Sequence, residues 1–143
     1  MNDLKTEIYQ KLLMICNDNI NKEKNEELEC FRSLTSPTIN VNDYFSRIVD
    51  YVYCEETTLK FMIVYILRIN KEYNVKFENV HRILLLACII AKKFNEDIVA
   101  SNSDYASAGG VSTTELMNLE LYFCMLLKYK LYDYDICKTY ASL

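Results

Sequence analysis

The chain contains few glycines and prolines and has no excess of positive charge, and each of these features excludes a class of protein. Two glycines and one proline in 143 residues cannot supply the turn that an all-β protein needs about every 8–12 positions. The net charge is −4, with 16 basic and 20 acidic residues mixed along the chain. Binding to a nucleic-acid backbone needs clustered lysine and arginine, so we expect no nucleic-acid partner.

Long hydrophobic runs are also missing. The longest, Ile83–Ala91, has about half the length that is needed to cross a bilayer. Met1–Tyr9 carries mixed charge and no apolar signal core, so nothing indicates secretion. We therefore expect a protein that lies inside the cell, in the cytoplasm, the nucleus or both, without a membrane partner.

The residues that form metal, redox and phosphate sites occur without the spacing that such sites require. The six cysteines show no CxxC pair, and several lie in apolar helical runs, where a free cysteine acts as a small hydrophobic residue. His81 is the only histidine and has no metal-site spacing around it. Gly109–Gly110 is a single pair outside any GxGxxG pattern and fits a turn better than a phosphate loop. We expect a reduced protein with no metal, no cofactor and no small-molecule ligand.

The composition that remains suits one helical domain, with 51% hydrophobic and 25% charged residues. Apolar residues recur at spacings of three and four, the helical period. Asn40 with Asp43, and Ser112 with Glu115, have the spacing of helix N-caps. These signals predict helices at 4–15, 40–54, 55–73, 79–95 and 112–131, a short segment at 104–108 and a final helix at 133–143.

Two connections are less regular. The polar stretch Asn17–Glu29 fits either a solvated extension of the first helix or a flexible connection, and Pro37 predicts a boundary.

By contrast, Ile83–Ala91 is apolar all round. A helix without a polar face must be surrounded by other helices, so this segment is predicted to lie at the centre of a bundle.

Three blocks of the chain carry motifs that go beyond helical periodicity: INVNDYFSRIVDYVYC (39–54), VHRILLLACIIAKKFNED (80–97) and NSDYASAGGVSTTELMNLELYF (102–123). The last block has the pattern N-x-x-Y-A-x-x-G-G-V-S-x-x-E-L-x-x-L-E. In this order the blocks resemble the first helix, the third helix, and the turn with the fifth helix of a cyclin box. The pattern of the last block is particular to the P-type cyclins of fungi, plants and protists, which are also called U-type or phosphate-response cyclins.

The resemblance implies an all-α fold, in which residues 37–143 form a single cyclin box of five helices around an apolar third helix and include a short C-terminal helix. Residues 1–36 are expected to form an N-terminal helix and a polar connection. The implied function is a non-catalytic subunit that binds a cyclin-dependent protein kinase and activates it by holding the kinase C-helix in the active position. The alternative is a cyclin-fold adaptor for another protein, although such adaptors usually have two repeats and basic surfaces, which this chain lacks.

The residues that would contact the kinase follow from the same resemblance. The K-F-x-E and L-E patterns place the two groups that hold the kinase C-helix at Lys93 and Glu120, and Arg47 of the first helix is implied to support them. Three further residues match positions with apolar groups facing the kinase: Phe94, Cys124 and Tyr129. The substrate-docking M-R-A-I-L patch of mitotic and S-phase cyclins is replaced by Ser46–Asp50, so we expect it to be absent.

Simpler interpretations exist for both central residues. Lys92 and Lys93 end a helix, where a cation offsets the macrodipole by roughly 0.3–1 kcal/mol. Glu120 interrupts an apolar helix between Leu119 and Leu121, where an unpaired buried carboxylate would be costly. It must therefore face solvent or meet a specific partner.

Overall fold

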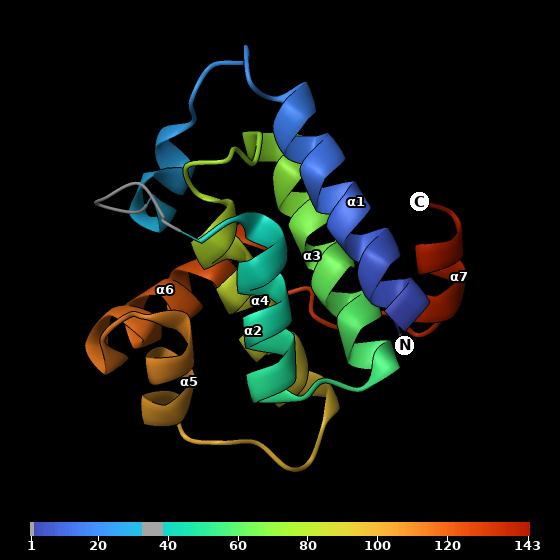
Figure 1. The fold of residues 1–143 in the computed structure, drawn as a ribbon, viewed down its shortest axis with the longest axis vertical. Coiled ribbons are helices and arrows are strands. Elements are labelled where there is room, and N and C mark those ends of the chain that lie inside the picture. The colour runs from blue at the N-terminus through green and yellow to red at the C-terminus, as the bar shows by residue number, and fades with distance from the viewer. Residues whose placement is uncertain (1, 33–38) are drawn as a thin grey trace.

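The computed structural model describes residues 2–32 and 39–143, and every regular element within these ranges is a helix (Figure 1). In chain order the elements are α1 (Asn2–Asp18), the 3-10 helix η1 (Glu26–Phe31), α2 (Val41–Val52), α3 (Glu56–Tyr73), α4 (Val80–Asn95), α5 (Asn102–Gly109), α6 (Thr113–Leu126) and α7 (Ile136–Ala141). The prediction of an all-α fold is confirmed. The five helices predicted for the box correspond to α2–α6, with α1 before them and the short α7 after them. The boundary predicted at Pro37 lies outside the described residues.

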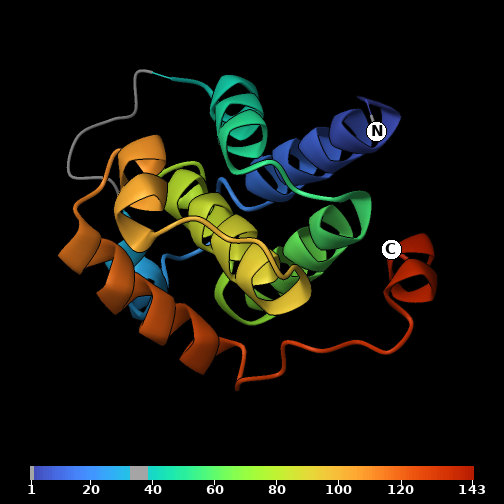
Figure 2. The same ribbon diagram turned by 90° about the horizontal axis from the view of Figure 1, so that it is seen from below.

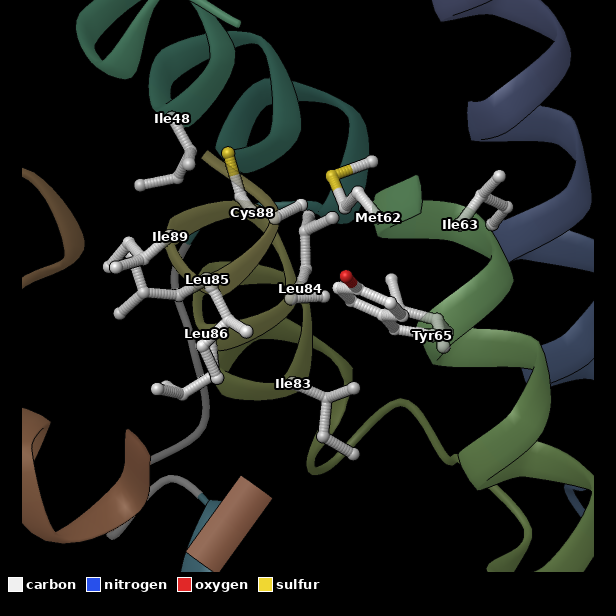
Figure 3. Close-up of a cluster of buried hydrophobic side chains, with 14 of the residues drawn as sticks. Ile48, Met62, Ile63, Tyr65, Ile83, Leu84, Leu85, Leu86, Cys88 and Ile89 are labelled. Atoms are coloured by element: carbon white, nitrogen blue, oxygen red, sulfur yellow. The ribbon is translucent and has the colours of Figure 1, made fainter. Parts of the chain in front are cut away.

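The apolar helix α4 lies at the centre of the bundle, as its composition predicts. It packs against α2, α3, α5, α6 and η1, and Figure 2 shows it enclosed by these elements. No residue of Ile83–Ala91 is more than 4% exposed. In Figure 3, Ile48 of α2 and Tyr65 of α3 reach toward α4 from two sides. Within the described part of the chain, no helix is both long and apolar enough to span a membrane.

Local side-chain caps fix the starts of α2 and α6. Asn40 accepts a hydrogen bond from the Asp43 N–H (2.8 Å), and Ser112 accepts one from the Glu115 N–H (3.1 Å), so both predicted caps are confirmed. Each cap satisfies a backbone donor that a helix N-terminus leaves free. The Glu115 carboxylate pairs with Arg82 (Oε1–Nη1 2.8 Å) and so joins α6 to α4.

The glycine pair ends α5 and lets it approach α4. Gly110 has φ +75°, the left-handed conformation that glycine adopts without strain, and it forms the predicted cap. Gly109 lies against the core: a Cβ atom at this position would stand 2.3 Å from Leu85 Cδ2. The turn between α5 and α6 therefore needs one glycine for its backbone angle and the other for close packing.

Helix α6 ends at Leu126, not near Leu131, so the predicted end is wrong by about one turn. Lys128 and Tyr129 take left-handed angles (φ 56° and 58°) that stop the helix. Helix α3 holds the chain beyond the turn, because Arg68 Nη1 donates to the Lys130 carbonyl (2.7 Å) and Tyr65 Oη donates to the Leu131 carbonyl (2.6 Å). The final helix is likewise shorter than expected and begins at Ile136.

The polar stretch after α1 is neither a helix extension nor a free connection. Helix α1 ends at Asp18, and η1 then buries Leu28 and Phe31 in the core. Asn19 is only 1% exposed and donates to Asn70 Oδ1 (2.7 Å) and to the Val75 carbonyl (2.8 Å). A few buried groups thus fix a segment whose composition is otherwise that of a solvated linker.

Candidate functional site

Lys93 and Glu120 form an ion pair at the surface where α4 meets α6. The Lys93 ammonium lies 3.0 Å from Glu120 Oε2 and 3.1 Å from Oε1. Lys93 leaves the last turn of α4 and Glu120 leaves the middle of α6, and these two helices pack together. The side chains are 27% and 23% exposed. The structure therefore brings together two residues that the sequence predicts separately, and both stay accessible.

Helix α5 adds a third side to the site. Asn102, in the first turn of α5, accepts a hydrogen bond from the Lys93 ammonium through Oδ1. The same ammonium lies over the ring of the buried Tyr105, 6.0 Å from its centroid, which is within range of a cation–π contact. Sequence reasoning missed both residues as part of the site, although they are the Asn and Tyr of the N-x-x-Y-A pattern.

The pair offers one donor group and one acceptor group side by side. A lysine ammonium carries three N–H donors, and an ionised carboxylate accepts at up to about four lone-pair sites. The mutual contact and Asn102 use part of this capacity, and the exposed remainder can bind polar groups of another molecule. The described residues contain no cluster of His, Cys, Asp or Glu that could hold a metal ion. The arrangement is thus suited to binding.

Exposed apolar side chains surround the pair. Phe94 follows Lys93 and is 47% exposed, and Leu121 follows Glu120 and is 70% exposed. Met117, Leu121 and Met125 recur every four residues along α6 and therefore share one face of the helix. An apolar stripe of this kind on a surface helix is available for contact with another molecule.

Two further predicted residues, Cys124 and Tyr129, follow Glu120 toward and just beyond the C-terminal end of α6. Cys124 is half-buried, one turn after Glu120. Burial raises the pKa of its thiol, and the nearby Glu120 charge adds to the rise while Lys93 opposes it. Tyr129 is 68% exposed in the turn that ends α6, and its N–H donates to the Cys124 carbonyl (2.9 Å). Phe94 and Cys124 therefore lie on the helices that carry the pair, and Tyr129 lies in the turn that follows α6.

Arg47 lies on α2, outside the helices that carry the pair. Its side chain is exposed on α2, and no hydrogen bond or ion pair joins it to Lys93 or Glu120 in the described residues. Its positive charge acts instead on Tyr44, one turn earlier, where it opposes the rise in pKa that burial causes. The contacts that support Lys93 come from Asn102 and Tyr105 of α5.

Lys92, next to Lys93, belongs to a separate buried cluster. Its ammonium lies 2.6 Å from Glu96 Oε1 and donates to the Tyr53 carbonyl (2.7 Å). Glu96 Oε2 accepts from the Thr58 hydroxyl (2.6 Å) and the Glu55 N–H (3.2 Å). The two charged side chains are only 9% and 7% exposed. This cluster ties the C-terminal end of α4 to the start of α3 and has a structural role.

The ionisation of this cluster follows from its contacts. Burial alone would raise the pKa of Glu96, but the Lys92 ammonium, the Thr58 hydroxyl and the Glu55 N–H outweigh it, and the net pKa is lowered. Burial alone would lower the pKa of Lys92, but the hydrogen bond and charge of Glu96 outweigh it, and the net pKa is raised. Both groups are therefore held in their charged forms.

His81 and two of the cysteines, Cys54 and Cys88, are buried among other residues of the fold. His81 is 8% exposed, donates from Nε2 to the Ile39 carbonyl (2.8 Å) and lies edge-on to Tyr44, with ring centroids 5.0 Å apart. The six cysteines are free thiols. Cys54 and Cys88 are both buried, with their sulfur atoms 3.3 Å apart.

Comparison with known proteins shows similarity to cyclins along most of the chain. The cyclin family model matches residues 7–131. The chain is 32% identical over 111 residues to Cyclin-U4-1 of Arabidopsis thaliana, covering 76% of this chain and 55% of that protein. It is 32% identical over 157 residues to PHO85 cyclin-7 of Saccharomyces cerevisiae, covering 99% of this chain and 54% of that protein. It is also 34% identical over 114 residues to the Nuc-1 negative regulatory protein preg of Neurospora crassa, covering 77% of this chain and 24% of that protein.

The chain spans about half the length of the plant and yeast relatives that it matches. The matched residues 7–131 extend from α1 through the turn after α6, and so include Lys93, Glu120 and their neighbours.

Proposed function

Because the chain belongs to the cyclin family and to its U-type (P-type) group, we propose that it binds a cyclin-dependent protein kinase and activates it. The yeast relative is named a PHO85 cyclin, and the proposal transfers that kind of partner to this chain. The observation that carries the proposal is the Lys93–Glu120 pair, accessible at the junction of α4, α5 and α6 and bordered by exposed apolar side chains.

The pair would bind the kinase C-helix through its main chain. The first N–H groups of a helix lack partners inside the helix, and the residues that lead into the helix leave their carbonyls free as well. Lys93 supplies donors for free carbonyls, and Glu120 supplies an acceptor for free N–H groups. Such contacts depend little on the side chains of the kinase helix, so they fix its position.

The apolar residues around the pair would supply the rest of the interface. Phe94 and Leu121 lie next to the pair in sequence, and Cys124 lies one turn after Glu120. Tyr129 follows in the turn that ends α6. Apolar groups around a polar centre exclude water from it, and this strengthens the central hydrogen bonds. The role that the resemblance gives to Arg47 remains a prediction, since Asn102 supplies the support for Lys93 in this structure.

Activation would follow from the choice between two kinase conformations. An active kinase needs the glutamate of its C-helix paired with the lysine of its ATP site. A subunit that binds only the helix-in conformation raises the population of that state, by about tenfold for each 1.4 kcal/mol of differential affinity. The chain itself would perform no chemistry.

The test is recovery of a kinase with the tagged chain from the cells that express it, followed by an activity assay of the recovered complex. Lys93→Ala/Glu120→Ala is expected to weaken kinase binding by more than about thirtyfold and to reduce activation with it. A matched control is Lys5→Ala/Asp50→Ala, which removes an exposed ion pair (3.5 Å) between α1 and α2. A kinase that binds both double variants equally well would contradict the proposed interface, and a stable partner that is not a kinase would favour the adaptor function.

A further inference from the structure

Four cationic side chains border one hollow on the surface between α3 and the turn that follows α6. Arg68 and Lys71 come from α3, and Lys128 and Lys130 come from the turn. The hollow has a volume of about 370 Å³ and is lined by these four residues with Glu72, Leu126 and Leu127. We call it the basic hollow.

The positive charge of the basic hollow is largely uncompensated. Its one carboxylate, Glu72, lies 3.6 Å from the Lys128 ammonium, with the two side chains 48% and 68% exposed. An exposed pair of this kind contributes only about 0–1 kcal/mol. Within residues 2–32 and 39–143, no carboxylate forms an ion pair with Lys71 or Lys130. Four positive charges thus face one negative charge, on a chain whose net charge is −4.

Asp133, an acidic group on which the Arg68 charge acts, is already engaged. The positive charge of Arg68 contributes to the lowered pKa of Asp133. The Asp133 carboxylate, however, accepts from the Thr139 hydroxyl (2.6 Å) and from the Asp135 N–H (3.0 Å), and both bonds contribute more to that shift. Asp133 therefore belongs to the start of α7 and does not close the basic hollow.

The backbone that carries the two lysines of the turn is held in place. Lys128 has φ 56°, and its N–H donates to the Met125 carbonyl (2.9 Å). Arg68 Nη1 donates to the Lys130 carbonyl (2.7 Å), which leaves other guanidinium N–H groups for a ligand. The backbone of the turn is thus fixed before any ligand binds, so less backbone entropy is lost on binding.

We propose that the basic hollow binds a phosphorylated peptide segment of a protein that the partner kinase modifies. A phosphoserine or phosphothreonine carries a charge of about −1.5 to −2 at pH 7 and three acceptor oxygens, which matches several converging cations better than a single carboxylate does. Leu126, which is half-buried and lines the hollow, offers apolar contact to the peptide beside the phosphate.

The position of the basic hollow supports a substrate as the occupant. Tyr129, on the proposed kinase face, lies between Lys128 and Lys130. A peptide bound in the basic hollow would therefore lie beside the kinase. Identification of the peptide as a kinase substrate rests on the proposed function, whereas the binding of a phosphorylated peptide by this chain does not.

The direct test measures fluorescence anisotropy of labelled peptides with the chain alone. The probes are a twelve-residue peptide with two phosphoserines, the same peptide without phosphate, and the same peptide with glutamate at both positions. We expect binding of the phosphorylated form, weakened by about tenfold in Lys71→Ala/Lys130→Ala, which corresponds to about 1.4 kcal/mol. The matched control, Lys22→Ala/Lys138→Ala, removes two exposed charges elsewhere and should change the affinity less than about twofold.

A third variant tests the hollow itself. Glu72→Gln removes its one carboxylate and should strengthen binding, which simple damage to the fold would not do. Equal binding of the glutamate peptide or the unphosphorylated peptide would overturn the proposal, and so would equal weakening by the control variant.

The kinase complex separates this proposal from the proposed function. With kinase bound, Lys71→Ala/Lys130→Ala should raise the KM for a substrate that already carries phosphate and leave the KM for its unphosphorylated form unchanged. If the chain binds the phosphorylated peptide but no kinase, the proposed function fails and the peptide site stands. If the kinase binds and neither KM changes, the assignment of the peptide as a substrate is wrong.

Discussion

Lys92 and Lys93 are consecutive in α4, yet their ammonium groups bind different carboxylates, Glu96 inside the fold and Glu120 at the surface. Successive side chains leave an α-helix about 100° apart, so one of the two faces α3 and the other faces α5 and α6. Substitutions at the two positions should therefore have different consequences.

The first prediction concerns the surface pair. Lys93→Ala or Glu120→Ala should weaken kinase binding by about 2 kcal/mol or more, roughly thirtyfold, because each removes a polar anchor from the centre of an interface. The double variant should lose less than the sum of the two single losses, since the residues act together. Isothermal titration calorimetry with purified kinase measures all three values.

An exchange of the two charges sharpens this prediction. Lys93→Glu/Glu120→Lys keeps an ion pair between α4 and α6, so thermal stability should stay close to that of the original chain. Kinase binding should still be lost, because donor and acceptor have changed places. Full binding by the exchanged variant would show that the pair only holds the two helices together.

The second prediction concerns the buried cluster. Lys92→Met leaves the Glu96 carboxylate, which is 7% exposed, without its cation. Removing one partner of a buried pair usually costs about 3–5 kcal/mol. Urea denaturation should therefore show a large loss in the free energy of unfolding for Lys92→Met and a much smaller loss for Lys93→Met. Similar losses in the two variants would contradict the different roles of the two lysines.

The third prediction is a pH dependence of stability. The pKa of Glu96 is lowered in the folded chain from its ordinary value of 4.5. A lowered pKa means that the unfolded chain binds the proton more tightly, so this stabilisation is present above about pH 4.5 and is lost as the pH falls through the folded value. Denaturation between pH 7 and pH 3 should show this loss, and Lys92→Met/Glu96→Gln should lack the part due to this pair.

The fourth prediction uses the cysteines as reporters of the interface. Cys137 and Cys30 are exposed, whereas Cys16, Cys54 and Cys88 are buried, and burial raises the pKa of Cys16 to about 12. Because the thiolate is the reactive form, iodoacetamide at neutral pH should label the exposed thiols and spare the buried ones.

Cys124 supplies the informative comparison. It is half-buried one turn from Glu120, so its labelling should slow when the kinase binds, while labelling of Cys137 stays unchanged. Mass spectrometry of digested samples measures both rates. Unchanged labelling of Cys124 in the complex would remove this residue from the proposed interface.

Much of the fold could be predicted because its signals are local. The caps at Asn40 and Ser112 depend on residues three positions away, and the all-round apolar character of α4 requires burial whatever its neighbours are. The end of α6 has no such signal. The apolar pattern continues past Leu126, and the turn is set by Arg68 and Tyr65, about sixty residues earlier.

The site could be predicted in part, for a similar reason. The resemblance identifies Lys93 and Glu120, but only folding shows that they meet and that Asn102 and Tyr105 complete their surroundings. Lys92 and Lys93 share the same local sequence, so periodicity and charge cannot separate their roles. The difference arises because Glu96 is held by Thr58 and the Glu55 N–H, which α3 supplies.

The complete enclosure of α4 has a consequence for how the molecule opens. Amides in the middle of this helix can exchange with solvent only when the surrounding helices separate, so α4 should belong to the slowest-exchanging, last-opening unit of the protein. Lys93 leaves the last turn of that helix. The residue proposed to hold the partner kinase therefore belongs to the helix that is expected to unfold last. Thermal motion of the outer helices would displace it little.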